Sequence, residues 1–147
     1  MSLTAYGLIM KEYPLMMAIP LIIYLLITKN MKPRSSLDSM ITFQSDNGKN
    51  QLSILLQDFL YANSSDNYVR IAYLSNNTVK QHLIRKPLKT IERELYTLSE
   101  IRRTHRSYLI NKMNIDSIKQ QKGRLSVDIR GNEIPVSKKF ENLFVAS

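Results

Sequence analysis

YVRIAYLSNNTVKQHLIR, residues 68–85, is the most regular stretch of this 147-residue chain. Apolar and polar residues alternate on both sides of Asn76-Asn77, which is typical of strands with one buried face. Adjacent asparagines tolerate the positive φ that a two-residue hairpin turn requires. The stretch therefore predicts an antiparallel β-hairpin.

The same alternation occurs elsewhere in the chain. In RLSVDIRGNEIPV (124–136) it predicts a second hairpin with a turn at Gly131-Asn132. A turn at Lys122-Gly123 would join this hairpin to a strand at 115–120. Shorter strand candidates are MITFQS (40–45), QLSILL (51–56) and FLYAN (59–63). Strands therefore dominate the chain after residue 40.

Helix patterns are fewer. Pro87 suits a first helical position, and apolar residues then recur at helical spacing at Leu88, Ile91, Leu95 and Leu98. Residues 137–144 predict a short C-terminal helix with Ser137 as its N-cap. We predict a mainly β domain of antiparallel strands with one central helix, preceded by an N-terminal hydrophobic helix.

The N-terminal part differs in composition. YPLMMAIPLIIYLLIT (13–28) contains no charge in 16 residues, and a helix of that length covers about 24 Å of a ~30 Å hydrocarbon core. We expect a membrane segment here; the alternative is a buried or interfacial helix. Basic residues follow it at 29–34, which places the rest of the chain in the cytoplasm. The predicted division is residues 1–35 and residues 36–147.

Composition narrows the class of function. The net charge is +9, and residues 36–147 hold 17 Lys and Arg against 11 Asp and Glu, which favours an acidic partner such as nucleic acid or an anionic membrane surface. There is no cysteine, and His82 and His105 are isolated from each other. Neither a paired acid and base nor a metal-ligand cluster is visible. We therefore expect no enzyme, no cofactor and no metal site.

The stretch IRRTHRSYLIN (101–111) concentrates positive charge. Arg102, Arg103 and Arg106 lie within five positions, together with His105, and no carboxylate lies between residues 101 and 111. A guanidinium can bind a phosphate, or the O6/N7 edge of guanine, with two hydrogen bonds. Ser107 can donate to phosphate oxygens. The alternative is a solvated turn with a core histidine.

Two further stretches have similar features. If Ser137 caps a helix, Lys138 and Lys139 lie in its first turn, where they oppose the helix dipole but create an anion site. The polar loop NSSDNYVR (63–70) offers Asn67 and Tyr68 to a base edge or for stacking. The alternatives are two solvated lysines and a plain turn.

These stretches, in this order, resemble the LytTR DNA-binding family of bacterial transcription regulators. The matching segments are DFLYANSSDNYVRI (58–71), LKTIERELYTL (88–98), IRRTHRSYLINKMNIDSI (101–118) and EIPVSKKF (133–140). The resemblance implies small stacked antiparallel sheets in an elongated domain. It also implies that loops enter successive major grooves of duplex DNA. Many members carry a receiver domain before this one, whereas residues 1–35 resemble the membrane-linked members.

The resemblance also assigns roles to residues. Its base-reading positions fall at Tyr68, Arg106 and Lys139, and its phosphate position falls at Ser107. Neighbouring contacts are expected at Asn67, His105 and Lys138, and the clustered charge adds Arg103 to the predicted DNA-binding set.

The expected partner is double-stranded DNA with repeated half-sites, bound by a homodimer. A membrane partner protein is the alternative to the homodimer. The domain is expected to lie in the cytoplasm, anchored to the bacterial inner membrane through residues 13–28. The alternative function is a membrane-surface or protein-interaction module whose basic face binds anionic partners.

Overall fold

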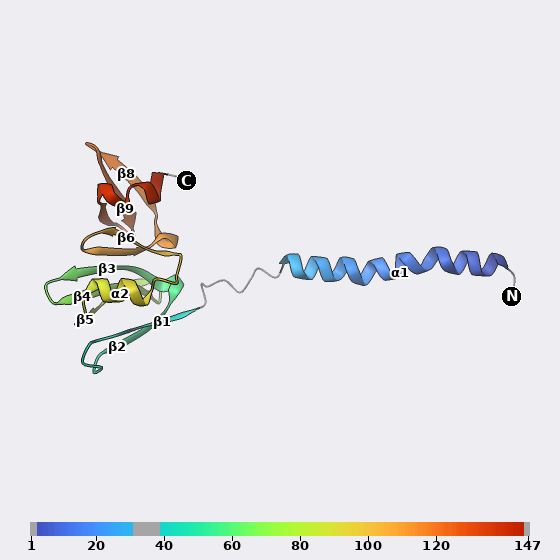
Figure 1. Ribbon diagram of the computed structural model, residues 1–147, viewed down its shortest axis with the longest axis horizontal. Helices are drawn as coiled ribbons and strands as arrows, with labels where there is room; N and C mark the ends of the chain where they lie inside the picture. The colour runs from blue at the N-terminus through green and yellow to red at the C-terminus, as the bar shows by residue number, and fades with distance from the viewer. Residues whose placement is uncertain (1–2, 31–38, 146–147) are drawn as a thin grey trace. The chain divides into compact units, whose positions relative to one another are not determined.

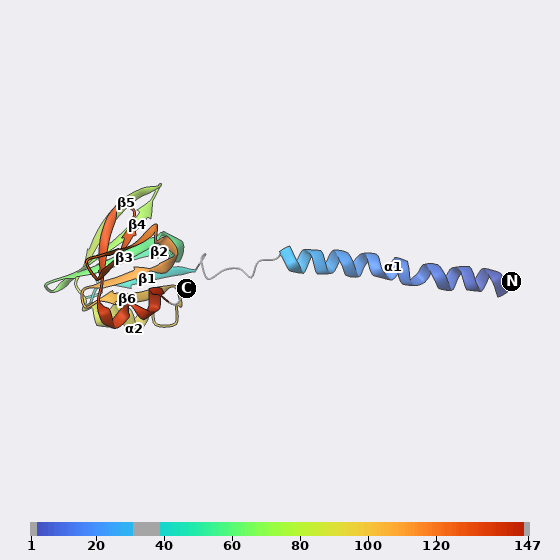
Figure 2. The same cartoon turned by 90° about the horizontal axis from the view of Figure 1, so that it is seen from above.

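The computed structural model describes residues 3–30 and 39–145 of the chain. The chain divides into two compact units, residues 1–35 and residues 36–147. In its described part, the first unit is one helix, α1 (Leu3–Asn30), and the second unit contains the strands (Figures 1 and 2).

α1 is 28 residues long and continues through Pro14 and Pro20. Within the residues that the structure describes, no helix is both long and apolar enough to span a membrane. The membrane segment predicted at residues 13–28, and the anchoring inferred from it, are therefore not supported.

The described part of the second unit contains ten strands in three antiparallel sheets. The central sheet has the order β5-β4-β3-β7-β6, with β3 (Phe59–Ser65), β4 (Tyr68–Ser75), β5 (Thr78–Ile84), β6 (Ile101–His105) and β7 (Tyr108–Asn111). A two-stranded sheet pairs β1 (Met40–Gln44) with β2 (Gln51–Leu55). The third sheet has the order β10-β9-β8, with β8 (Ser117–Gln121), β9 (Arg124–Ile129) and β10 (Asn132–Val136). The predicted mainly β, antiparallel architecture is confirmed.

The helical elements of this unit are short. α2 (Leu88–Glu94) lies between β5 and β6, and α3 (Asn142–Val145) lies near the C-terminus; single 3₁₀ turns occur at Leu56–Asp58, Lys112–Asn114 and Lys138–Phe140. α2 begins after Pro87, as predicted, but ends before Leu95 rather than extending to Leu98. Leu95 and Leu98 still pack against the core, although both residues follow the end of the helix.

The hairpin turns follow from residues that accept positive φ. Asn76 (φ 50°) and Asn77 (φ 61°) form the predicted turn between β4 and β5. The turn between β9 and β10 lies one residue earlier than predicted, because Arg130 (φ 50°) and Gly131 (φ 79°) have the positive values. Asn132 is instead the first residue of β10, where it pairs with Ile129.

The middle of the central sheet is buried on both faces. Neighbouring residues of β7 illustrate this, because Leu109 belongs to one hydrophobic core and Ile110 to the other. The first core joins the sheet to β1, β2 and α2, and the second joins it to the three-stranded sheet and α3. Figure 1 shows the same order, with the three-stranded sheet and the β1–β2 hairpin on opposite sides of the central sheet.

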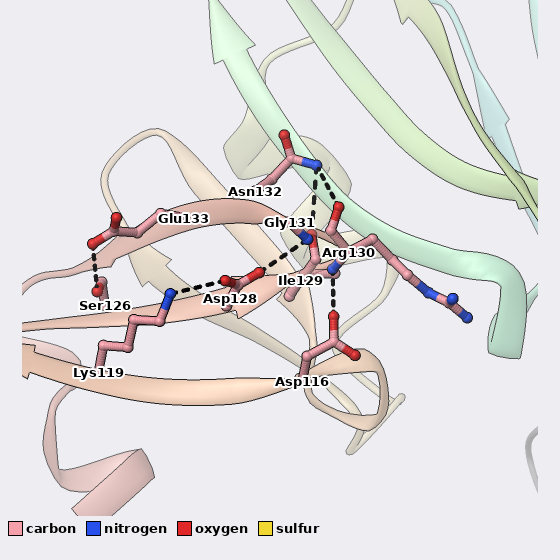
Figure 3. A network of polar contacts seen from close by, with 9 residues as sticks. All are labelled: Asp116, Lys119, Ser126, Asp128, Ile129, Arg130, Gly131, Asn132 and Glu133. Atoms are coloured by element: carbon pink, nitrogen blue, oxygen red, sulfur yellow. Dashed lines mark hydrogen bonds and ion pairs between the residues drawn. The ribbon is translucent and has the colours of Figure 1, made fainter.

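A polar network stabilises the three-stranded sheet (Figure 3). Asp128 accepts a hydrogen bond from the backbone N–H of Gly131 at 3.0 Å and pairs with Lys119 at 3.0 Å. Asp116 accepts from the backbone N–H of Arg130 at 2.5 Å. Two carboxylates therefore hold the β9–β10 turn and tie it to the neighbouring strand.

A fully buried asparagine anchors the end of β7. Asn111 donates from Nδ2 to the carbonyls of Leu56 (2.8 Å) and Phe59 (3.0 Å). Its Oδ1 accepts from the backbone N–H of Met113 at 3.1 Å. Each hydrogen bond satisfies a polar group that would otherwise be costly to bury. Asn111 thus fixes the β6–β7 hairpin against the turn that precedes β3.

Candidate nucleic-acid interface

The β6–β7 hairpin carries the cluster of arginines. Residues 106 and 107 form its turn, and the ladder is irregular between Arg103 and His105. Arg106 is exposed, and its guanidinium makes no hydrogen bond or ion pair with any described residue. His105 accepts at Nδ1 from the backbone N–H of Ser107 at 3.2 Å. In a neutral ring the proton is then on Nε2, where it can be donated to a ligand.

The other two arginines of this hairpin make contacts within the chain. Arg102 donates from Nη1 to the carbonyl of Ile101 at 2.8 Å. Arg103 forms an ion pair with Glu92 of α2 at 2.5 Å. The charge of Arg103 is therefore compensated by a carboxylate outside the stretch 101–111. Of the three arginines, Arg106 is the one whose guanidinium has no partner among the described residues.

The turn between β3 and β4 presents the next predicted residues. Asp66 has a φ of 52°, and Ser65 pairs with Tyr68 across the turn. Asn67 is exposed, and Tyr68 is 47% exposed although it begins a strand whose next residue is buried. Arg70 is also exposed and, two residues further on, lies on the same face of β4 as Tyr68. Arg70 was not among the predicted residues, although strand alternation could have identified it.

The third stretch differs from its prediction. Lys138–Phe140 is a single 3₁₀ turn, and the side chain of Ser137 makes no capping hydrogen bond. Ser137 therefore occupies the predicted N-cap position without the expected side-chain bond, and the turn after it is too short to sum peptide dipoles along a helix axis. Lys138 and Lys139 are nevertheless both exposed.

Backbone hydrogen bonds bring the three stretches together. The N–H of Ser64 donates to the carbonyl of Ser107 at 2.9 Å, and the N–H of Ser137 donates to the carbonyl of Thr104 at 2.7 Å. Because β3 and β7 are antiparallel neighbours, the turn after β3 and the turn before β7 lie at the same end of the central sheet's strands. We call residues 66–68, 105–107 and 137–139 the three-loop surface.

Seven of the eight predicted contact residues lie on this surface. They are Asn67, Tyr68, His105, Arg106, Ser107, Lys138 and Lys139. The eighth, Arg103, lies on β6 and its side chain is 20% exposed. The surface carries the cations of Arg106, Lys138 and Lys139 against the single carboxylate of Asp66.

Aromatic rings lie behind the β6–β7 turn. The Tyr108 ring centroid lies 6.0 Å from that of His105 and 6.4 Å from that of Tyr61. Burial, with a smaller contribution from Tyr108, raises the pKa of Tyr61, and nearby Arg70 and a hydrogen bond with Gln81 oppose that rise. Tyr61 therefore keeps its proton at neutral pH. Among the described residues, no three His, Asp or Glu side chains gather as metal ligands.

Comparisons with known proteins agree with this geometry. A family model described as the LytTr DNA-binding domain matches residues 49–146, which include all of the three-loop surface. The chain belongs to the LytTR family. A solved structure described as the LytTr DNA-binding domain of a methyl-accepting/DNA response regulator from Bacillus cereus is 18% identical, with a TM-score of 0.52. The match covers 72% of this chain and 93% of that one, and it shows a shared fold. No curated protein matches the chain.

Membership of the LytTR family settles the general class of activity. The chain carries a LytTR DNA-binding domain, and the partner of such a domain is DNA.

Proposed function

We propose that the LytTR domain binds duplex DNA sequence-specifically through the three-loop surface and thereby regulates transcription. The observation that supports this most strongly is the pair of backbone hydrogen bonds from Ser64 to Ser107 and from Ser137 to Thr104. They gather three loops, distant in sequence, around residues 104–107. The loops present exposed cations and hydrogen-bonding groups, which together suit phosphates and base edges.

The side chains suggest a division of roles. Arg106 is exposed and free to form two parallel hydrogen bonds with the O6/N7 edge of guanine. Lys139 and Tyr68 would read the flanking bases in the major grooves on either side. Lys138 and Ser107 would hold phosphates, which fix position and carry no sequence information.

The proposed number of copies rests on one three-loop surface for each domain. One domain presents one three-loop surface, so a second copy is needed to occupy a repeated half-site. We propose that two copies bind repeated half-sites as a homodimer on DNA.

The test is selection of bound duplexes from a random pool with the full chain. We expect a recurring motif and a clear preference for it over scrambled duplex. With about six phosphates neutralised, log affinity should fall with log salt at a slope of roughly −5. Absence of a recurring motif would refute sequence-specific binding.

The alternative, a basic module for anionic surfaces, is tested by competition. The selected duplex should displace the chain from anionic vesicles that contain phosphatidylserine at equal phosphate concentration. Retention on the vesicles would favour the alternative, because a non-specific cationic face responds to phosphate charge rather than to base sequence.

A further inference from the structure

We propose that Arg103 is a positioning residue, which holds the Arg106 turn in its DNA-reading geometry through Glu92 of α2. This inference rests on the proposed function of the three-loop surface. It assigns Arg103 a role different from the direct contact that the sequence predicted.

Each nitrogen of the Arg103 guanidinium has a partner within the chain. Nε donates to the carbonyl of His105 at 3.2 Å, and Nη2 donates to the carbonyl of Arg106 at 2.5 Å. Nη1 donates to Oε2 of Glu92 at 2.5 Å. The planar fork therefore joins two successive carbonyls of the turn to a carboxylate on a different element.

The helix that carries this carboxylate is held in place by packing. Ile91, the neighbour of Glu92 in α2, is 1% exposed and belongs to the first hydrophobic core. The side chain of Glu92 is 37% exposed and that of Arg103 is 20% exposed, so the pair is partly shielded from water. The contacts thus connect the core through α2 to the backbone of the turn.

The turn needs such support because its strand ladder is irregular. The register shifts between Arg103 and His105, next to the turn. The guanidinium of Arg106 has no partner among the described residues, so the direction of its side chain depends on the backbone that carries it. A bidentate contact tolerates displacements of only about 0.5 Å. Loss of the Arg103 contacts should therefore reduce discrimination between sequences.

A direct phosphate contact by Arg103 makes the opposite prediction for a conservative variant. Arg103→Lys keeps the positive charge but replaces the planar fork by a point donor, which cannot reach three acceptors in this arrangement. If Arg103 acts through charge, the lysine variant should bind as the wild type does. If it acts through geometry, the variant should lose discrimination.

The experiment compares Arg103→Lys and Glu92→Ala with a matched control on the same helix. Glu94→Ala removes an ion pair of similar length, since Glu94 lies 2.6 Å from Lys86. It changes the net charge by the same amount as Glu92→Ala, but Glu94 does not contact the turn. For each full-length variant, affinity is measured for the selected duplex and for scrambled duplex at one salt concentration.

We expect Glu92→Ala and Arg103→Lys to lower the preference for the selected duplex about tenfold, which corresponds to about 1.4 kcal/mol. Glu94→Ala should keep the wild-type preference. Both alanine variants should bind scrambled duplex equally well, because each removes one negative charge. Glu92→Gln, which keeps an oxygen acceptor for Nη1, should restore most of the preference.

A second measurement does not depend on DNA. Amide hydrogen exchange in residues 104–108 should be faster in Glu92→Ala than in the wild type, and unchanged in Glu94→Ala. Equal preference and equal exchange in the two alanine variants would overturn the inference, as would wild-type discrimination by Arg103→Lys. If the wild type itself prefers no duplex, the proposed function is wrong and the inference falls with it.

Discussion

The substitution Asn111→Ala should destabilise the LytTR domain more than any exposed change in its loops. Asn111 is fully buried at the end of β7. The substitution removes its Nδ2 donor from the carbonyls of Leu56 and Phe59, at 2.8 and 3.0 Å, and its Oδ1 acceptor from the N–H of Met113. The β6–β7 hairpin, which carries Arg106, would lose the side-chain hydrogen bonds that join its end to residues 56 and 59.

The magnitude follows from what remains after the substitution. The carbonyl of Leu56 keeps the N–H of Phe59 as a donor, and the carbonyl of Phe59 keeps Nδ2 of Asn114 at 2.7 Å. Neither carbonyl is stranded, so the loss is about 1 kcal/mol for each of these two buried hydrogen bonds. The third bond, from the N–H of the exposed Met113, is only partly buried, so water replaces it and it is not counted. The vacated side-chain volume adds about 1 kcal/mol, giving roughly 3 kcal/mol in total.

The control is Asn114→Ala, because Asn114 binds the same carbonyl of Phe59 but is only half-buried. Water can replace its hydrogen bonds, so the expected loss is about 1 kcal/mol or less. Urea unfolding of the full chain, followed by the near-ultraviolet circular dichroism of its tyrosines, measures both values. Equal losses for the two variants, or a loss below about 1 kcal/mol for Asn111→Ala, would refute the reasoning.

Three further predictions concern binding, pH and the third sheet. Arg106→Ala should lose about 1–3 kcal/mol of binding free energy on the selected duplex only. Lys138→Ala should weaken binding to all duplexes alike and reduce the salt slope by about 1. Arg130→Ala, an exposed control in the β9–β10 turn of Figure 3, should leave the preference for the selected duplex unchanged. Because the folded pKa of Tyr61 is raised, its protonated form adds stability that is complete below about pH 10 and is lost as pH rises above that value. Tyr61→Phe should therefore show a smaller fall in unfolding free energy across this range. Asp128→Ala should lower the unfolding free energy by about 1 kcal/mol, mainly through the lost hydrogen bond to the β9–β10 turn.

Much of the fold could be predicted because its rules are local. A period of two residues and a pair of turn residues suffice for the β4–β5 hairpin, and Asn76 and Asn77 have the positive φ that the sequence required. The β9–β10 turn shows the limit of such rules. There Arg130 accepts positive φ, and the carboxylates of Asp128, within β9, and Asp116, just before β8, accept from the turn's backbone N–H groups.

Helix ends were predicted less well. The spacing of Leu95 and Leu98 fits a helix, yet both side chains pack against the core from the irregular segment that follows α2. Ser137 looks like an N-cap in the sequence, but its backbone N–H is bound by Thr104 of β6, and the residues after it form only a 3₁₀ turn. In both cases a tertiary contact overrides local preference.

The candidate site could be located from the sequence because its residues lie at turns. Exposed polar and basic residues between strands predict contact loops, and seven of the eight predicted residues lie on the three-loop surface. The partner of Arg103 could not be found in this way. Glu92 lies eleven residues away on another element, and only the fold brings the two side chains together.

This arrangement explains why one short hairpin contains three arginines. Arg102 and Arg103 bind carbonyls of the hairpin and its neighbours, which leaves Arg106 as the one with a free guanidinium. The same hairpin backbone binds the other two loops through Ser107 and Thr104. A change that moves the hairpin would therefore displace all three loops at once, because their positions share one support. Substitutions in different loops of the three-loop surface should then be nearly additive, whereas each should couple strongly to a substitution of the support.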